Sequence, residues 1–169
     1  MLKNKSGFTL MELLGVVLIL AILTSIALPQ YRRSLERAKA MEGIMTLKTV
    51  ADSAKRYKAA TSQAPTGFNQ LDVQFDTSSS YAVGSTDPQK KINNFRFQFS
   101  PTFISACAVV VSGIHDDDKG YCFYFYYNHE TQGRDTITCK RTTTGGKYDW
   151  LCEGLGTELV AADEWLIDG

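Results

Sequence analysis

The chain has 169 residues, 44% of them hydrophobic, and its 18 basic side chains equal its 18 acidic ones. This length is typical of one domain, the neutral balance argues against a nucleic-acid-binding surface, and the hydrophobic content excludes an acidic disordered chain. The apolar residues are unevenly distributed, because one unbroken apolar block lies near the N-terminus.

That block runs from Phe8 to Leu28, and its 21 residues match the roughly 20 that a helix needs to cross a bilayer. Lys3 and Lys5 precede it, so the short leader is expected to stay cytoplasmic. The alternative is a signal peptide cut after Ala27. Glu12 argues against a signal peptide, because an acid inside a membrane segment costs roughly 2.5–3.5 kcal/mol and indicates a function.

The segment Ser-Gly-Phe-Thr-Leu-Met-Glu-Leu-Leu, residues 6–14, resembles the prepilin processing site of type IV pilins and pseudopilins. The resemblance is close from Lys3 to Tyr31 and concerns only the architecture beyond it. It implies that a prepilin peptidase cuts after Gly7 and methylates the new N-terminal residue, giving N-methylphenylalanine at Phe8. Glu12 then falls at the fifth mature position, as in the family. We expect its carboxylate to pair with the α-amino group of Phe8 on a neighbouring subunit.

The resemblance also implies a function, a location and a set of partners. The protein would be a structural subunit of a type IV pilus or a pilus-like filament. It would be held in the cytoplasmic (inner) membrane by its lipid-facing helix, then polymerise with itself into an extracellular helical filament. Its partners would be the prepilin peptidase, an assembly ATPase and a platform membrane protein. The expected parts are a leader (1–7), a transmembrane and filament-core helix (8–28), an amphipathic helix (29–62) and a globular pilin domain (63–169) with a C-terminal disulfide loop.

Pro29 is expected to kink the long helix, because proline lacks a backbone N–H and clashes with the preceding turn. Beyond it, residues 30–61 predict an amphipathic helix whose apolar face packs on a sheet. The apolar positions recur every three or four residues: Leu35, Ala38, Met41, Ile44, Met45, Leu47, Val50, Ala51, Ala54 and Tyr57.

The fold class expected is α+β, with the long helix packed on an antiparallel sheet of about four strands. Four segments have strand patterns: 94–99, 106–111, 121–127 and 135–140. Gly113, Gly120 and Gly133 lie in the expected connections. Residues 71–75 also alternate like a strand, residues 78–80 predict a solvated serine loop, and 163–168 predict either a last strand or a docking tail. Residues 116–118, three consecutive aspartates, predict a solvated hairpin turn, with a calcium site as the alternative.

The four cysteines, Cys107, Cys122, Cys139 and Cys152, predict disulfides, because the membrane block implies export. Three pairings are open from the residues alone. The resemblance favours Cys139–Cys152, which corresponds to the C-terminal disulfide loop of pilins, and leaves Cys107–Cys122 to join neighbouring strands. No metal site is predicted, because no Cys-x-x-Cys pair occurs and the two histidines, His115 and His129, are expected in loops between strands.

No catalytic motif occurs in the sequence, so we expect no enzyme activity and no cofactor. Alternatives within the family are a type II secretion pseudopilin, a minor pilin and a DNA-uptake pilin. Two cysteine pairs favour a pilin over the major secretion pseudopilin. A DNA-uptake pilin would need a basic patch, and the only basic cluster expected near the tip is Lys140, Arg141 and Lys147.

Overall fold

A computed structural model describes residues 9–74, 79–81, 89–112, 115–127, 136–141, 148–161 and 163–167. The chain divides into two compact units, Met1–Ala38 and Lys39–Gly169. The predicted processing residues Gly7 and Phe8 lie outside the described residues. So do Gly113, Gly133, His129 and most of the loop expected between Cys139 and Cys152.

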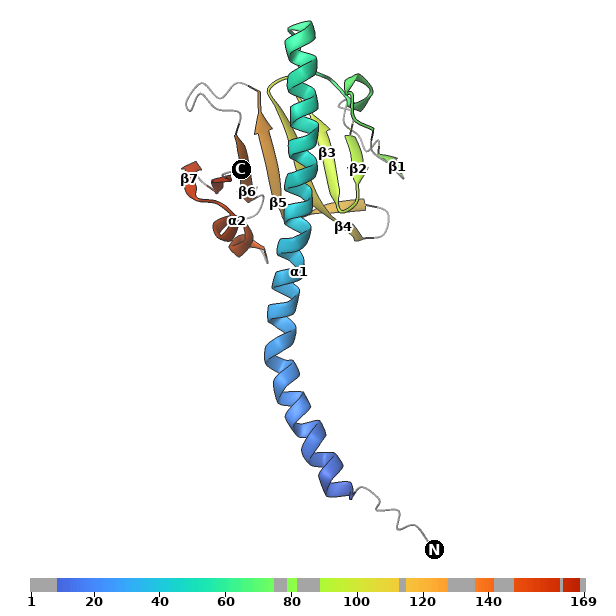
Figure 1. Ribbon diagram of the computed structural model, residues 1–169, viewed down its shortest axis with the longest axis vertical. Helices are drawn as coiled ribbons and strands as arrows, with labels where there is room; N and C mark the ends of the chain where they lie inside the picture. Colours follow the sequence, from blue (N-terminus) through green and yellow to red (C-terminus); the bar gives the residue numbers. More distant parts are fainter. Residues whose placement is uncertain are drawn as a thin grey trace, which may run out of the picture. The chain divides into compact units, whose positions relative to one another are not determined.

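One helix, α1 (Leu10–Thr61), covers both predicted helical segments, with Pro29 inside it. In the second unit, α1 lies across one face of the sheet (Figure 1) and shares one hydrophobic core with it. The helix residues in that core recur every three or four positions: Ala40, Ile44, Leu47, Val50, Ala51 and Ala54.

The predicted apolar face was wrong at Leu35, Ala38, Met41 and Met45, which are all exposed. Met45 is 64% exposed, although the neighbouring Ile44 is buried. Successive residues on an α-helix point about 100° apart, so only one edge of a broad apolar stripe can face the sheet.

The described residues form a sheet of eight strands, so the prediction of about four was wrong. The α+β class with antiparallel pairing is confirmed. The spatial order is β1-β2-β3-β4-β5-β6-β8-β7, so β8 lies between β6 and β7. The bounds are β1 Ser79–Tyr81, β2 Gln89–Ile92, β3 Phe95–Phe99, β4 Phe103–Ser112, β5 His115–Tyr126, β6 Ile137–Arg141, β7 Glu158–Ala161 and β8 Glu164–Ile167, with α2 at Asp149–Leu155 and a 3-10 turn at Phe68–Gln70.

The central strands bury alternate residues, as their period-two pattern predicts. In β3 the buried residues are Phe95, Phe97 and Phe99, and Arg96 and Gln98 between them are half-buried. Phe123 and Phe125 of β5 are buried in the same core. Aromatic side chains therefore form most of the surface on which α1 packs.

Two predicted connections are parts of β5 instead. The backbone of residues 116–118 pairs with Val109–Val111 of β4, so the prediction of a hairpin turn there was wrong. His115 is the first residue of the same strand rather than a loop residue. Gly120 has a φ of 96° and lies where the β4–β5 register shifts, so this glycine permits a bulge within one long strand.

The remaining differences concern short elements. Residues 71–74 are not a strand, because Asp72 there holds the connection against α1 by accepting hydrogen bonds from Ser53 and Arg56. Strand β1 includes Ser79 and Ser80, which were expected in a loop. The C-terminal segment forms strand β8, which settles the choice between a strand and a docking tail.

Gly43 allows α1 to approach the sheet, and we expect Gly43→Ala to destabilise the fold by about 1–3 kcal/mol. A Cβ atom at this position would lie 2.4 Å from the Phe95 ring, which is itself only 2% exposed. Denaturant unfolding followed by tryptophan fluorescence measures the effect. Gly15→Ala is the matched control, because a Cβ there meets nothing within 4 Å. An unchanged midpoint for Gly43→Ala would contradict this packing.

Candidate assembly site on the N-terminal helix

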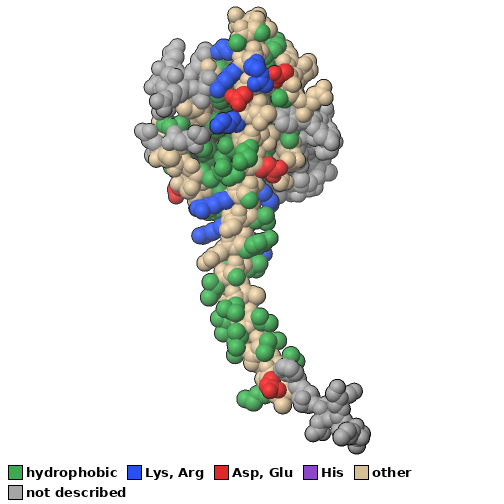
Figure 2. Space-filling model, viewed as in Figure 1, with side chains coloured by type: hydrophobic (Ala, Val, Ile, Leu, Met, Phe, Trp, Pro, Cys, Tyr) green, Lys and Arg blue, Asp and Glu red, His purple; other side chains and the backbone are tan. Residues whose placement is uncertain are grey.

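The first unit contains an apolar stretch of α1 that none of the described residues covers. Hydrophobic side chains stand out along this part of the helix (Figure 2). This part of the helix is fully exposed, and the helix is long and apolar enough to cross a membrane. Burial of such a surface in lipid or against other helices is strongly favourable.

Glu12 lies in the first turn of this helix and caps it. Its carboxylate atom Oε2 accepts hydrogen bonds from the backbone N–H and the hydroxyl of Thr9, both at 2.8 Å. The Thr9 hydroxyl oxygen in turn accepts the backbone N–H of Glu12 at 3.3 Å. This reciprocal arrangement is a capping box, which satisfies backbone donors that the first helical turn leaves unpaired.

The cap occupies only one of the two carboxylate oxygens of Glu12. Both hydrogen bonds from Thr9 end on Oε2, so within the described residues Oε1 keeps its capacity to accept another donor. An ionised carboxylate away from water needs a cation as well as hydrogen bonds. The acid is therefore held in a fixed position, with one oxygen available for a positive group.

The role of Thr9 was missed from the sequence. Thr-x-x-Glu at the start of an apolar run is the pattern of a capping box, and it would have identified this residue.

Further along, the hydroxyls of Thr24 and Ser25 donate to main-chain carbonyl oxygens of their own helix, at Leu20 and Ile22. These bonds satisfy the hydroxyls within the apolar stretch. Pro29 lies four residues after Ser25 and has no backbone N–H, so it cannot donate to the carbonyl oxygen of Ser25.

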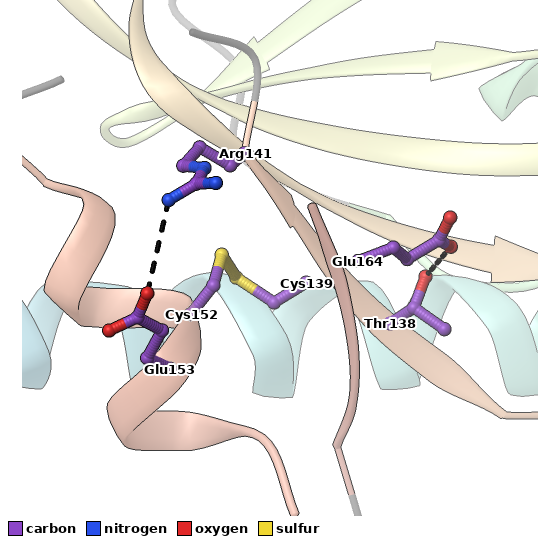
Figure 3. Close-up of a disulfide and its surroundings, with 6 residues drawn as sticks. All are labelled: Thr138, Cys139, Arg141, Cys152, Glu153 and Glu164. Carbon is purple, nitrogen blue, oxygen red and sulfur yellow. Dashed lines mark hydrogen bonds and ion pairs between the residues drawn. A yellow bond between two sulfur atoms is a disulfide. The ribbon is translucent and has the colours of Figure 1, made fainter. Parts of the chain in front are cut away.

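Both predicted disulfides are confirmed. Cys107 and Cys122 face each other on β4 and β5, with a Cα–Cα distance of 4.0 Å. The second bond joins Cys139 of β6 to Cys152 of α2 (Figure 3). Cys139 and Cys152 are both buried, so this bond attaches the short helix α2 to the hydrophobic core.

Arg141, which sequence reasoning treated only as part of a small basic cluster, lies beside the Cys139–Cys152 bond. Its guanidinium forms an ion pair with Asp163, approaches Glu153 of α2 at 3.9 Å, and lies 5.4 Å from the centre of the Trp165 ring. The side chain is only 16% exposed. These contacts hold β6, α2 and β8 together, and nothing in the local sequence pattern indicates them.

A second polar contact lies on the other side of β6. The Thr138 hydroxyl donates to Oε1 of Glu164 at 2.6 Å, and both residues are buried (Figure 3). Burial and the negative charge of Glu164 raise the pKa of Tyr126 to about 12.

Among the described residues, no group of three or more His, Cys, Asp or Glu could hold a metal ion.

The structure thus combines an exposed apolar helix that begins with a capped acid and an α+β domain with two disulfides. Residues 2–28 match the family model for the prokaryotic N-terminal methylation motif. The resemblance to the type IV pilin family is thus confirmed.

The curated relatives agree with this assignment. Two fimbrial proteins of Pseudomonas aeruginosa are each 37% identical to the chain over 97 residues. The match covers 55% of this chain and 62% of each relative, so the chain spans less than two thirds of the relatives' length. No solved structure matches the chain.

Proposed function

We propose that the protein is a structural, non-enzymatic subunit of a type IV pilus or pilus-like filament. The apolar part of α1 first anchors it in the cytoplasmic membrane, and the same surface then packs among the helices of other subunits. The observation that carries this proposal is an exposed apolar helix that contains one fixed carboxylate, Glu12. A plain membrane anchor gains nothing from an acid that costs free energy in lipid.

Polymerisation supplies the partner that this acid lacks within its own helix. The Glu12 carboxylate of one subunit binds the α-amino group of Phe8 on the next, because pairing neutralises both charges away from water. Contacts that run from one subunit to the next without closing generate a helical filament rather than a ring. A prepilin peptidase, an assembly ATPase and a platform membrane protein complete the proposed machinery, and the leader (1–7) is removed before assembly.

The function is tested by imaging surface filaments on cells with and without the gene for this chain. Filaments that disappear on deletion, return on complementation and contain this protein in sheared preparations would support the proposal. Unchanged filaments in the deletion strain, or a protein found only as a secreted monomer, would contradict it.

Maturation gives a separate prediction. We expect the mature protein to begin at Phe8 with an N-methylated α-amino group, because Gly7 offers a cut site without a side chain at the membrane edge. Mass spectrometry of the N-terminal peptide from the membrane fraction measures this directly. A mature chain beginning at Leu28 would instead identify a cleaved signal peptide and contradict the filament function.

A further inference from the structure

Two arginines, Arg32 and Arg33, lie four and five residues after Leu28, at the end of the apolar part of α1 that is far from the leader. Arg32 and Arg33 are exposed, and basic side chains cluster along this stretch of the helix (Figure 2). Arg33 also has an interaction within the chain. The preceding residue, Tyr31, is 65% exposed. The only acid between Tyr31 and Ala38 is Glu36, which is 7% exposed and has an interaction of its own within the chain.

The position of these arginines along the helix can be compared with the dimensions of a bilayer. The 19 residues from Leu10 to Leu28 span about 28 Å, close to the roughly 30 Å hydrocarbon core. Arg32 and Arg33 then lie about 6–8 Å beyond Leu28, within a headgroup layer roughly 5–8 Å thick. Arg37 lies about 14 Å beyond it, outside that layer.

The direction in which helical side chains point also supports placing Arg32 and Arg33 in the headgroup layer. In an α-helix the Cα–Cβ bonds tilt toward the N-terminus, which in this chain is the direction of the membrane. The side chains of Arg32 and Arg33 therefore leave the helix in the direction of the headgroups. An exposed tyrosine directly before them is typical of a membrane interface.

We propose that Arg32 and Arg33 bind the phosphate groups of anionic phospholipids in the leaflet opposite the leader. This inference rests on the proposed membrane anchoring of the subunit. Guanidinium groups bind phosphate oxygens through paired, charge-assisted hydrogen bonds, so arginine suits this contact better than lysine. Because the leader lysines already account for the orientation in the membrane, the arginines are not needed to set it.

Lipid binding at this site would set the depth of the subunit in the membrane. Once the leader is removed, Lys3 and Lys5 no longer hold the cytoplasmic end, and Arg32 and Arg33 become the main polar anchor. The subunit would then stay at a constant depth in the membrane, with Glu12 near the cytoplasmic surface. Assembly would later remove the subunit from the membrane.

The test uses the full chain, purified from membranes in neutral detergent and titrated with phosphatidylglycerol, with bound lipid counted by native mass spectrometry. We expect Arg32→Gln/Arg33→Gln to bind about 25-fold more weakly, since each cation at an anionic surface contributes roughly a factor of five. Arg37→Gln/Lys48→Gln removes the same charge outside the headgroup layer and should bind like the parent. Phosphatidylcholine should bind none of the three proteins measurably.

Three results would overturn the inference. Equal phosphatidylglycerol affinity in both double variants would show that total charge, not position, controls binding. Displacement of the lipid by millimolar inorganic phosphate would identify a free-anion site. Equal binding of phosphatidylcholine would show that only the apolar helix is recognised. A parent chain that is released from membranes by alkaline carbonate would instead contradict the anchoring itself, so the two failures are distinguishable.

Discussion

Cells that make only the Glu12→Leu variant should assemble almost no filaments, although the variant subunit is inserted, processed and folded. Leucine favours the membrane more than glutamate does, so a loss of assembly cannot be attributed to poor insertion. Removing Glu12 leaves the proposed partner, the α-amino group of Phe8, without a counter-charge, which costs about 3–5 kcal/mol for a buried pair. That cost recurs with every added subunit. The measurement is the yield of sheared filaments relative to membrane-bound subunit.

Variants that separate the helix cap from the negative charge of Glu12 provide the control. Glu12→Gln keeps an oxygen that can accept the Thr9 hydrogen bonds but removes the negative charge. If charge pairing between subunits drives assembly, this variant also fails to assemble. Thr9→Val removes the hydroxyl but leaves the Glu12 charge and the Thr9 backbone donor in place, so it should assemble better than either. Normal filament yield from Glu12→Gln would show that the acid serves only to cap its own helix.

Removing the Cys139–Cys152 bond should lower the free energy of unfolding by about 3 kcal/mol, within a range of about 2–5 kcal/mol. The two cysteines are separated by 13 residues, and in the chain-entropy model closing a loop of that size restricts the unfolded chain. The bond also attaches α2 to β6, and Arg141 supports the same junction. Cys139→Ala/Cys152→Ala is the variant.

Unfolding of this variant can be followed by tryptophan fluorescence in denaturant, because both tryptophans, Trp150 and Trp165, lie in α2 and β8. Cys107→Ala/Cys122→Ala is the comparison, since that bond has a similar separation of 15 residues but joins strands that already pair directly. Both variants should be less stable, and only loss of the first bond should change the fluorescence of the folded state. A Cys139→Ala/Cys152→Ala chain as stable as the parent would contradict the proposed role of the bond.

The amino-acid sequence was sufficient to predict the features that depend on local pattern. The apolar block, the long amphipathic helix and the alternation of Phe95, Phe97 and Phe99 each follow from spacing along the chain. The motif around Glu12 indicated the family, and the resemblance supplied the disulfide pairing. The Thr9–Glu12 cap was missed, although its pattern could have predicted it, because a helix start of this kind needs only four consecutive residues.

Tertiary structure decided the features that depend on distant neighbours. Strands β1, β2 and β7 have only three or four residues, and such segments become strands because a partner satisfies their backbone hydrogen bonds. The place of β8 between β6 and β7 depends on pairing with a strand formed about 25 residues earlier. Packing also decided which side of α1 faces the sheet: Gly43 lies on that side, close to Phe95, whereas Met41 and Met45 are exposed. Packing selects one arrangement among those that local periodicity allows, because burial and hydrogen bonding act across the whole sheet.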